Sequence, residues 1–450
     1  MSKKLFNSFD AVSAKQWKQK IQFDLKGADY NTTLNWHTNH DITVKPFYHA
    51  DDFNALPNPS NTQATKWRIC ETIYVADEKT ANKRAINALK KGAECIKFII
   101  PSNSISIENL LNAINIDETP LYFECDFISE SFIKNSYSKF KKTAIFQNDI
   151  IHNLAKIGNW YANLNTDFNT FKAIVSQTNS ISIDTTLYQN AGANIVQQLA
   201  YALAHANEYL NVLTLPQNAV INFNVAIGSN YFFEIAKLKA LRLLWQTLAH
   251  EYKTNTECHI FATPNKRNKT IYDYNTNMLR TTTECMSAIL GGANTISNLA
   301  YDSVYNKTNA FGSRIARNQL LILKHESYFN KVNNPTDGAY YIENLTQQLA
   351  EKALELFKNI ETNGGFLKQL KSGIIQRKIK ESAAKETEQF NNGTLVLLGT
   401  NKHPNSLDKM KNNLELYPFV KTNKRKTLIE PVIERRLAET LEQNRLKTES

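Results

Sequence analysis

The side chains that most often carry chemistry are scattered along this sequence, and few share a useful spacing. His250 and Glu251 are adjacent, but no second histidine follows at the spacing that zinc-binding helices use. Cys258 and His259 are neighbours in a predicted strand, where successive side chains point to opposite faces and cannot meet at one metal. These patterns predict neither a metal site nor an independent catalytic site.

One segment carries a more specific arrangement. Residues 186–193 read Thr-Leu-Tyr-Gln-Asn-Ala-Gly-Ala. This resembles the active-site loop of the coenzyme-B12-dependent acyl-CoA mutases, whose usual form is Tyr-His-Met-Gln-Glu-Ala-Gly-Ala. Gln189 and the final Ala-Gly-Ala match, whereas Thr186 stands at the family's tyrosine and Leu187 at its catalytic histidine. A leucine cannot polarise a carbonyl or transfer a proton, so the resemblance implies a mutase-like fold without this part of the chemistry.

Other motifs extend the resemblance over most of the chain. Segments similar to motifs of the methylmalonyl-CoA mutases follow in the family's order: 17–30 with 43–48, 232–245, 314–318, 334–343 and 364–366. The first of these is similar to the N-terminal signature of the family's small subunit. Each motif is short, and their shared order gives the resemblance its strength.

Two more positions depart from the catalytic pattern. Thr72 stands where the family has an aromatic residue in its first strand, and Ser297 stands where the catalytic subunit has a histidine near its eighth strand. Residues 147–149 read Gln-Asn-Asp, as in a family substrate loop, but no arginine follows at a useful spacing. We interpret that match as coincidence. The resemblance therefore implies that this chain has no catalytic residues.

The family's cofactor is adenosylcobalamin, held by a flavodoxin-like domain whose Asp-x-His-x-x-Gly motif supplies the cobalt ligand. None of the nine histidines here is followed by x-x-Gly, and we expect no complete domain of that kind before Ser450. The cofactor supplies the radical chemistry, and the protein must hold and orient it. The resemblance thus implies that the large subunit of a complex binds adenosylcobalamin and that this chain binds no cofactor.

The elements that would position these residues follow from an alternation of strand and helix patterns. Eight short apolar segments are predicted as strands: 69–75, 95–100, 121–127, 143–146, 171–175, 220–226, 257–262 and 295–299. Strands buried on both faces and separated by helices favour a parallel sheet. The count and span predict a (β/α)8 TIM-type barrel over residues 66–310. A doubly wound sheet would show the same alternation, and the missing Gly-x-Gly-x-x-Gly only weakly disfavours it.

Two further regions flank the predicted barrel. Residues 1–65 are interpreted as an N-terminal extension with a helix over 14–26 that ends before Gly27. Residues 311–450 are predicted to be a mostly helical C-terminal part. Within it we expect helices at 314–326, 345–361 and 428–446 and a short strand at 395–398.

The extension also holds the candidate contacts with a partner. Trp17, Leu25, Tyr30, Phe47 and Tyr48 are large side chains of the kind that dominate the energy of protein interfaces. We predict that they anchor the extension on a second subunit. The alternative is that they pack on their own barrel.

Composition places the chain among globular proteins, with 450 residues, of which 42% are hydrophobic and 21% charged. No apolar run reaches the roughly 18 residues of a transmembrane helix, and the N-terminus lacks the apolar core of a signal peptide. The five cysteines are widely spaced and form no Cys-x-x-Cys pair, which is typical of reduced thiols. We therefore expect a cytoplasmic protein that does not bind membranes.

The net charge of +11 comes from lysines and arginines along the whole chain, with one denser run at 421–426. Such an excess can attract nucleic acids or phosphates, but no zinc-finger, RRM or KH pattern accompanies it. We interpret the charge as solvated faces and expect no nucleic-acid partner.

Taken together, the resemblance implies a non-catalytic structural subunit of heterodimeric, adenosylcobalamin-dependent methylmalonyl-CoA mutase, whose large subunit interconverts methylmalonyl-CoA and succinyl-CoA. Two alternatives stay open. One is an active acyl-CoA mutase barrel that receives a cobalamin domain in trans, which an intact Tyr-His pair at positions 186 and 187 would favour. The other is a binding protein that docks acyl-CoA or a chaperone without catalysis, which a neighbouring large-subunit gene would argue against.

Overall fold

The computed structural model describes residues 8–55, 57–60, 62–138, 144–213, 215, 219–254, 256–421 and 424–449. Eight parallel strands form one sheet in the order β6-β5-β4-β3-β10-β9-β8-β7. Their bounds are β3 Arg68–Tyr74, β4 Cys95–Ile100, β5 Leu121–Cys125, β6 Ala144–Phe146, β7 Ser180–Asp184, β8 Val220–Ile227, β9 Glu257–Pro264 and β10 Thr295–Ile296.

The order of the strands confirms the predicted barrel. Each strand lies beside its neighbours in the chain, and the last strand, β10, pairs with the first, β3. A doubly wound sheet keeps its first and last strands apart, so that alternative is excluded. The two end strands, β6 and β7, lie in contact with each other, which makes the barrel nearly closed.

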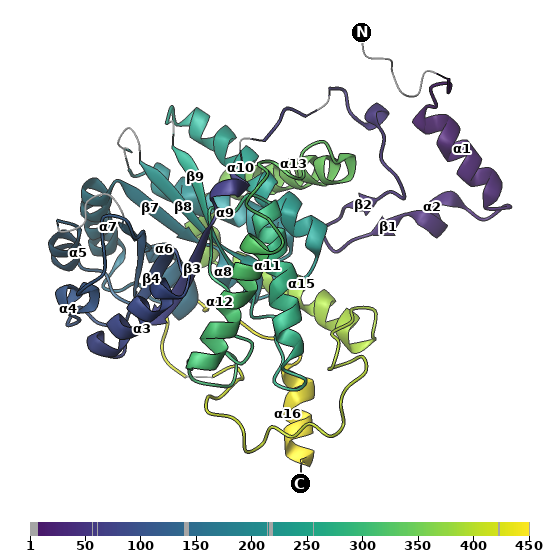
Figure 1. Ribbon diagram of the computed structural model, residues 1–450. Helices are drawn as coiled ribbons and strands as arrows, with labels where there is room; N and C mark the ends of the chain where they lie inside the picture. Colours follow the sequence, from purple (N-terminus) through teal and green to yellow (C-terminus); the bar gives the residue numbers. More distant parts are fainter. Residues whose placement is uncertain are drawn as a thin grey trace.

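The helices cover the outside of the strands (Figure 1). In chain order the wall contains α3 Glu78–Lys90, α4 Ile107–Leu111, α5 Glu130–Tyr137, α6 Ile150–Ile157, α7 Leu164–Thr178, α9 Ile195–Leu210, α10 Tyr231–Glu251, α11 Thr276–Leu290 and α12 Ala310–His325. Apolar side chains between strands and helices form the two largest clusters of the core. The barrel therefore stays closed through burial on its outer face.

The fifth predicted strand, 171–175, was wrong. Phe171, Ile174 and Val175 lie on the buried face of helix α7, at the i, i+3 and i+4 spacing of a helix. Asn179 ends that helix in the left-handed region with a φ of 50°. The strand itself follows as β7, where Ser180–Asp184 alternates serine with isoleucine in the period of two that a strand requires.

The C-terminal part packs beside the barrel. Helix α13, Tyr340–Thr362, lies against α9 and α10, and is followed by α14, Phe366–Lys371, and α15, Ile374–Asn391. Helix α15 was not predicted. The predicted strand at 395–398 was wrong, because that segment contributes only an isolated bridge between Leu398 and Lys402.

The predicted final helix at 428–446 was wrong in its first half, since only α16, Glu439–Thr448, is helical there. Residues 428–438 instead form an irregular segment, which we call the strap. Pro431 cannot continue a helix, and the backbone N–H groups of the strap find acceptors on the barrel instead. Those of Leu428, Val432 and Leu437 donate to Gly158, Ala155 and Arg267 at 3.0, 2.8 and 2.8 Å.

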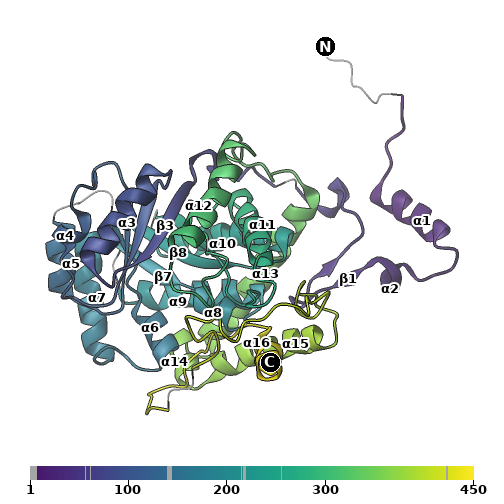
Figure 2. The same ribbon diagram turned by 60° about the horizontal axis from the view of Figure 1, so that its bottom comes forward.

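The N-terminal arm, residues 8–55, begins with a helix that stands away from the barrel in both views (Figures 1 and 2), whereas Trp36 and His40 farther along the arm pack on Phe233 of α10. Helix α1, Ala14–Asp24, begins at a capping box of Ser13 and Gln16, as the sequence predicted to within two residues. After it come α2 Tyr30–Leu34, the antiparallel pair β1 Trp36–His37 and β2 Thr43–Val44, and the 3-10 turns η1 Ala50–Asp52 and, beyond the arm, η2 Ala64–Lys66. None of the residues of α1 is buried.

Two further findings concern the cysteines and the lengths of the helices. All five cysteines are free and buried, which confirms the prediction of unpaired core thiols. Among the described residues, every helix is too short or too polar to cross a lipid bilayer.

Candidate functional site

In a barrel of this kind the functional face is formed at the carboxyl ends of the strands. The mutase-like segment lies there, because α8, Thr186–Asn190, begins just after β7 ends at Asp184. The backbone N–H of Thr186 donates to Oδ1 of Asp184 at 2.9 Å. The Leu187 side chain is 2% exposed and lines the cavity at the mouth of the barrel. An alkyl group therefore occupies the place of the expected histidine.

The matching half of the segment has a structural use. The Gln189 amide lies between Glu234 and Lys237 of α10, at 3.2 and 3.1 Å. Lys237 also donates to the Ala226 carbonyl at 2.7 Å, at the end of β8. Burial lowers the pKa of Lys237, and the Glu234 carboxylate opposes that shift. Gln189 thus fastens α8 to α10 and to the neighbouring strand.

Gly192 is fixed by close packing. Its φ is +103°, a conformation that side chains disfavour, and a Cβ there would lie 2.5 Å from the Cβ of Ala383 in α15. The Ala-Gly-Ala portion of the motif therefore serves the contact between the barrel and the C-terminal helices. Its preservation is explained without any catalytic role.

Thr72 and Ser297 meet inside the barrel. Their hydroxyl oxygens are 2.7 Å apart, on β3 and just after β10. Thr186 is engaged separately with Asp184. The four positions 72, 186, 187 and 297 thus carry three hydroxyl groups and one alkyl group. None of these side chains is a general acid or base with a pKa near neutrality.

The rest of the interior is filled by hydrogen-bonded side chains. The Tyr122 hydroxyl forms hydrogen bonds with Thr295 Oγ1 and His259 Nε2, at 2.8 and 3.1 Å. On the other side, Asn224 accepts from Gln147 and from Asn222, both at 2.9 Å. An apolar cluster accompanies them, formed by Cys70, Cys95, Tyr122 and Phe261. Most polar groups of the interior thus bond with one another, although Gln147 Oε1 and Asn222 Oδ1 have no partner among the described residues.

One ion pair also lies in the interior. Lys97 of β4 and Glu124 of β5 are 2.6 Å apart. Burial favours the protonated form of Glu124, but the Lys97 ammonium outweighs it and lowers the pKa of the carboxyl to about 2. The sequence analysis missed this pair. A single charged residue inside an otherwise apolar strand was the available signal.

His259 is a further interior residue without an assigned role in the sequence. Burial, with help from the charges of Arg242 and Arg68, lowers its pKa to about 3, so the ring is neutral at pH 7. Cys258, its neighbour, belongs to the core outside the barrel, so the two side chains point to opposite faces. Within the described ranges, no three His, Cys, Asp or Glu side chains are grouped as metal ligands.

A buried network lies beneath α8. Asp149 Oδ1 accepts from His205 Nε2 at 2.9 Å and from the Tyr209 hydroxyl at 2.6 Å, and Tyr188 meets the other ring nitrogen of His205 at 3.1 Å. Burial raises the pKa of Asp149, but His205 and other donors overcome this and hold it at about 2. Because the His205 side chain is fully buried, this arrangement supports the structure rather than a reaction.

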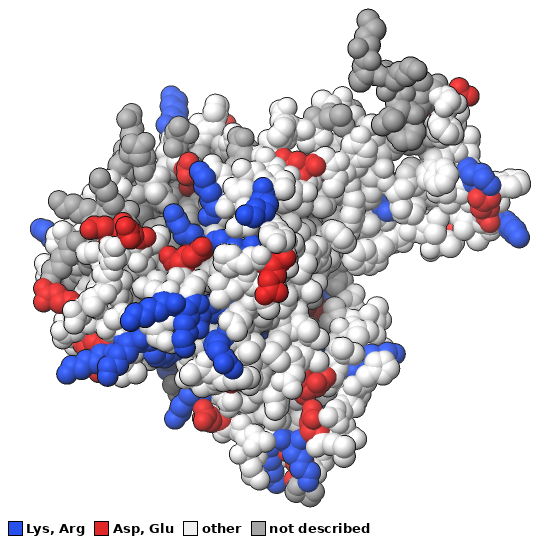
Figure 3. Space-filling view, in the orientation of Figure 1, with Lys and Arg blue, Asp and Glu red and all other residues white. Residues whose placement is uncertain are grey.

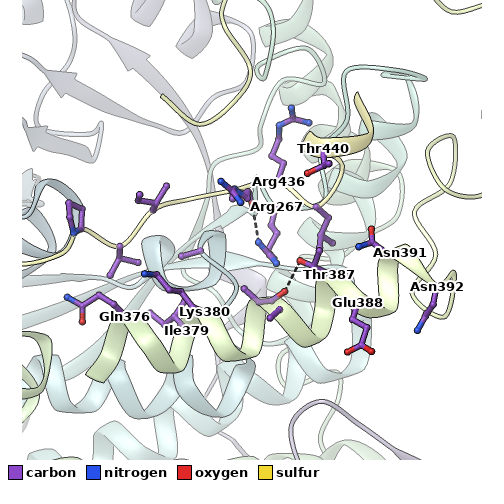
Figure 4. Close-up of a pocket in the computed structure, with 18 residues that line it drawn as sticks. Arg267, Gln376, Ile379, Lys380, Thr387, Glu388, Asn391, Asn392, Arg436 and Thr440 are labelled. Carbon is purple, nitrogen blue, oxygen red and sulfur yellow. Dashed lines mark hydrogen bonds between the residues drawn. The ribbon is translucent and has the colours of Figure 1, made fainter. Parts of the chain in front are cut away.

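A cavity of about 860 Å³ opens at the mouth of the barrel, between the strand ends and the strap. Its wall includes Lys156, Lys266, Arg267 and Arg435, with Glu434 among them. The Glu434 carboxylate raises the pKa of Lys266, 3.6 Å away. A cavity of similar size, about 850 Å³, lies between α15 and residues 431–440. Figure 4 shows Arg267 beside that second cavity, where it donates to the Arg435 carbonyl at 2.8 Å.

The predicted interface residues occupy two environments in the arm. Trp17 is 50% exposed and lies edge-on to Phe47, at 6.4 Å between ring centroids, while Leu25 caps the same helix, α1. Tyr30 is buried within the arm itself, under the ammonium of Lys18. Tyr48, in contrast, packs on Tyr341 of the chain's own α13 at 5.4 Å.

The sheet order and the place of α8 define a TIM-type α/β barrel whose functional face is the mouth. A family model for methylmalonyl-CoA mutase matches residues 100–447. The methylmalonyl-CoA mutase small subunit of Porphyromonas gingivalis is 33% identical over 440 residues, covering 89% of this chain and 71% of that protein. The chain belongs to the methylmalonyl-CoA mutase family, which confirms the resemblance found in the sequence.

Other relatives share smaller parts. Methylmalonyl-CoA mutase of Rhizobium meliloti is 28% identical over 454 residues, covering 86% of this chain and 64% of that protein. The enzyme of Cereibacter sphaeroides is 37% identical over 235 residues, covering 50% and 33% of the two chains. The chain therefore spans only part of the length of the mutases it matches.

Proposed function

We propose that this chain is the non-catalytic, structural subunit of a heterodimeric methylmalonyl-CoA mutase. In this proposal the large subunit binds adenosylcobalamin and interconverts methylmalonyl-CoA and succinyl-CoA. The barrel interior is the observation that carries the proposal, since polar side chains hydrogen-bond there both between neighbouring strands and between strands that are not paired. A reacting substrate needs both space there and groups left free to bind it.

The residues at the mouth do not fit the family's cofactor. Leu187 offers neither a proton nor a lone pair, and the strap is hydrogen-bonded across the strand ends. The three hydroxyls at positions 72, 186 and 297 are already paired within the chain. We therefore assign adenosylcobalamin to the large subunit and derive no step of the reaction on this barrel.

The arm supports the assignment of a partner. Phe23 and Val12 are 78% and 56% exposed, and Trp17 is 50% exposed. Apolar side chains gathered on a segment that leaves the body of the protein are typical of a surface covered by another chain. In this proposal residues 1–65 contact the large subunit, residues 66–310 form the degenerate barrel, and residues 311–450 complete the mutase domain.

Co-expression with a large-subunit candidate tests the proposal. The two chains are purified through a tag on this one, and mutase turnover is measured on each chain alone and on the pair. We expect this chain to be inactive alone and to copurify with its active partner in a fixed ratio. Failure to copurify, or turnover by this chain alone, would contradict the proposal.

The mouth cavity of about 860 Å³ favours the second candidate, an active barrel that uses a cobalamin domain supplied in trans. A separate reaction distinguishes it. This chain is mixed with an isolated cobalamin domain, adenosylcobalamin and methylmalonyl-CoA, without the large subunit. Succinyl-CoA formation would establish the active barrel, and its absence supports the structural role.

A further inference from the structure

A charged pocket on the outer wall of the barrel has no part in the proposed function. It has a volume of about 490 Å³ and lies between α3 and the beginning of α12. Figure 3 shows lysine and arginine side chains gathered over this part of the molecule. The pocket is separate from the mouth cavity, and no lining residue is shared between them.

Four cationic side chains line the pocket against one carboxylate. Arg84 and Lys91 come from α3 and the residue after it, Arg314 and Arg317 come from α12, and Glu71 comes from β3. Arg317 Nη1 pairs with Glu71 at 2.9 Å. This single pair leaves the lining with an excess of three positive charges.

The remaining cations are not engaged in direct ion pairs among the described residues, although burial raises the pKa of Glu71 and the charge of Arg84, like that of Arg317, opposes this shift. Within the described residues, Arg84, Lys91 and Arg314 form no ion pair, and Arg314 only lies over the Phe311 ring at 5.3 Å. Arg317 is 5% exposed, and its Nε has no hydrogen-bond partner among the described residues. A buried guanidinium N–H without an acceptor costs free energy. An anion in the pocket would supply the acceptor that this N–H lacks.

The first turn of α12 adds neutral donors. Asn309 caps it, accepting from Gly312 N at 2.7 Å through its side chain and from Ser313 N at 3.2 Å through its carbonyl. The N–H groups of Ala310 and Phe311 have no acceptor in the part of the chain that the structure describes, and both residues line the pocket. The beginning of a helix also carries a partial positive charge, which favours an anion at that end.

We infer that this pocket binds the phosphate or pyrophosphate group of a small molecule. Arginine side chains hydrogen-bond to phosphate oxygens in pairs, and such charge-assisted bonds are stronger than neutral ones. The volume is in the range of small-molecule sites. The same chemistry serves a free inorganic anion and the phosphates of a nucleotide. The inference does not depend on the subunit role proposed above.

Isothermal titration of the full chain at low ionic strength tests the site, with inorganic phosphate, pyrophosphate and ADP as probes. The double variant Arg84→Gln with Arg314→Gln removes two charges that form no direct ion pair among the described residues and keeps the direct Arg317–Glu71 pair, so it should remain folded; a thermal melt checks this. We expect it to bind pyrophosphate or ADP at least about tenfold more weakly, because one hydrogen bond to a charged group accounts for about that factor.

The matched control is Lys79→Gln with Lys83→Gln, which removes the same number of positive charges, both from α3 and both outside the pocket lining. It should change the affinity by less than about twofold, whereas Glu71→Gln should tighten binding by removing the competing carboxylate. Equal affinities for pyrophosphate and ADP would indicate an anion site, and tighter ADP binding a nucleotide site. No binding of any probe at millimolar concentration, or equal weakening by the control, would overturn the inference.

Discussion

The barrel interior and the N-terminal arm differ in how far their side chains find partners within the chain. In the interior, donors and acceptors from β3 through β10 find one another, and even the Lys97 and Glu124 charges are paired. In the arm, α1 has no buried residue and Trp17 keeps half of its surface exposed. The interior pairs most of its polar groups within one chain, with Gln147 Oε1 and Asn222 Oδ1 left unpaired among the described residues, whereas the arm has exposed apolar side chains.

Under the proposed function, this difference marks where selection for chemistry has been replaced by selection for assembly. A catalytic site keeps groups unpaired so that a substrate can pair with them. The interior has no such reserve at Thr72 and Ser297, which bond to each other. An interface segment gains its energy only when a partner arrives. In the proposed function the arm is such a segment, and the barrel is its base.

The largest effect should come from breaking the interior support beneath α8. Asp149→Ala leaves His205, the Tyr209 hydroxyl and two backbone N–H groups without their acceptor. We expect the free energy of unfolding to fall by about 3–5 kcal/mol, as for other broken buried charge pairs. Urea unfolding measures it. The control is Asp77→Ala, which removes an exposed cap of α3 and should cost far less. Equal losses would mean that the network is not a support.

A substitution in the arm should weaken binding of the partner and leave the stability of the isolated chain unchanged. Trp17→Ala should weaken the complex with the large subunit by about thirtyfold, or about 2 kcal/mol, if Trp17 is an interface anchor. The stability of the isolated chain should hardly change, because the side chain is half exposed and α1 has no buried residue. Phe311→Ala is the control, an equally exposed aromatic of α12 (52% against 50%). A titration of labelled chain with partner measures both, and similar weakening by both variants would remove Trp17 from the interface.

The interior should also respond to pH, because it holds a neutral histidine. The pKa of His259 falls from 6.5 in the unfolded chain to about 3 in the folded one. The unfolded state therefore binds the proton first, and stability is lost as the pH falls from 6.5 towards 3. Between pH 7 and pH 5 the loss from this group should be about 1–2 kcal/mol. His259→Gln, which keeps a partner for Tyr122, should lose less than the wild type in urea unfolding. An unchanged pH dependence would show that the ring is solvated.

The barrel was predictable because each strand is short, apolar and followed by a helical pattern. The one misplaced strand shows the limit of that reasoning. The apolar run that begins at Phe171 resembles a buried strand but belongs to helix α7. In the actual strand, β7, isoleucines alternate with serines, so the segment has no continuous apolar run. The strap was also mispredicted, because its sequence has the pattern of a charged helix. Pro431 interrupts that helix, and the backbone N–H groups of the strap donate to carbonyl groups of the barrel instead.

The candidate site was predictable only where a motif marked it. Leu187 and Ser297 could be placed by their motifs, but the pairing of Ser297 with Thr72, 225 residues away, could not. The same holds for Asp149, whose partners His205 and Tyr209 lie 56 and 60 residues along the chain. No local period links such residues, so only the closed sheet shows that they meet.

The smallest effect, no gain in turnover, is expected from a substitution at Leu187, where the sequence departs from the catalytic histidine of its family. Leu187→His restores the missing histidine, yet it should produce no succinyl-CoA from methylmalonyl-CoA when cobalamin is supplied and the partner is absent. One imidazole cannot supply the space that the paired interior occupies, and the strap still crosses the mouth. A coupled turnover assay decides this, with Leu187→Met as a control of similar volume. Turnover by Leu187→His and not by Leu187→Met would mean that the barrel lost its activity through this residue alone, and the contrast between a closed interior and an open arm would no longer explain the protein.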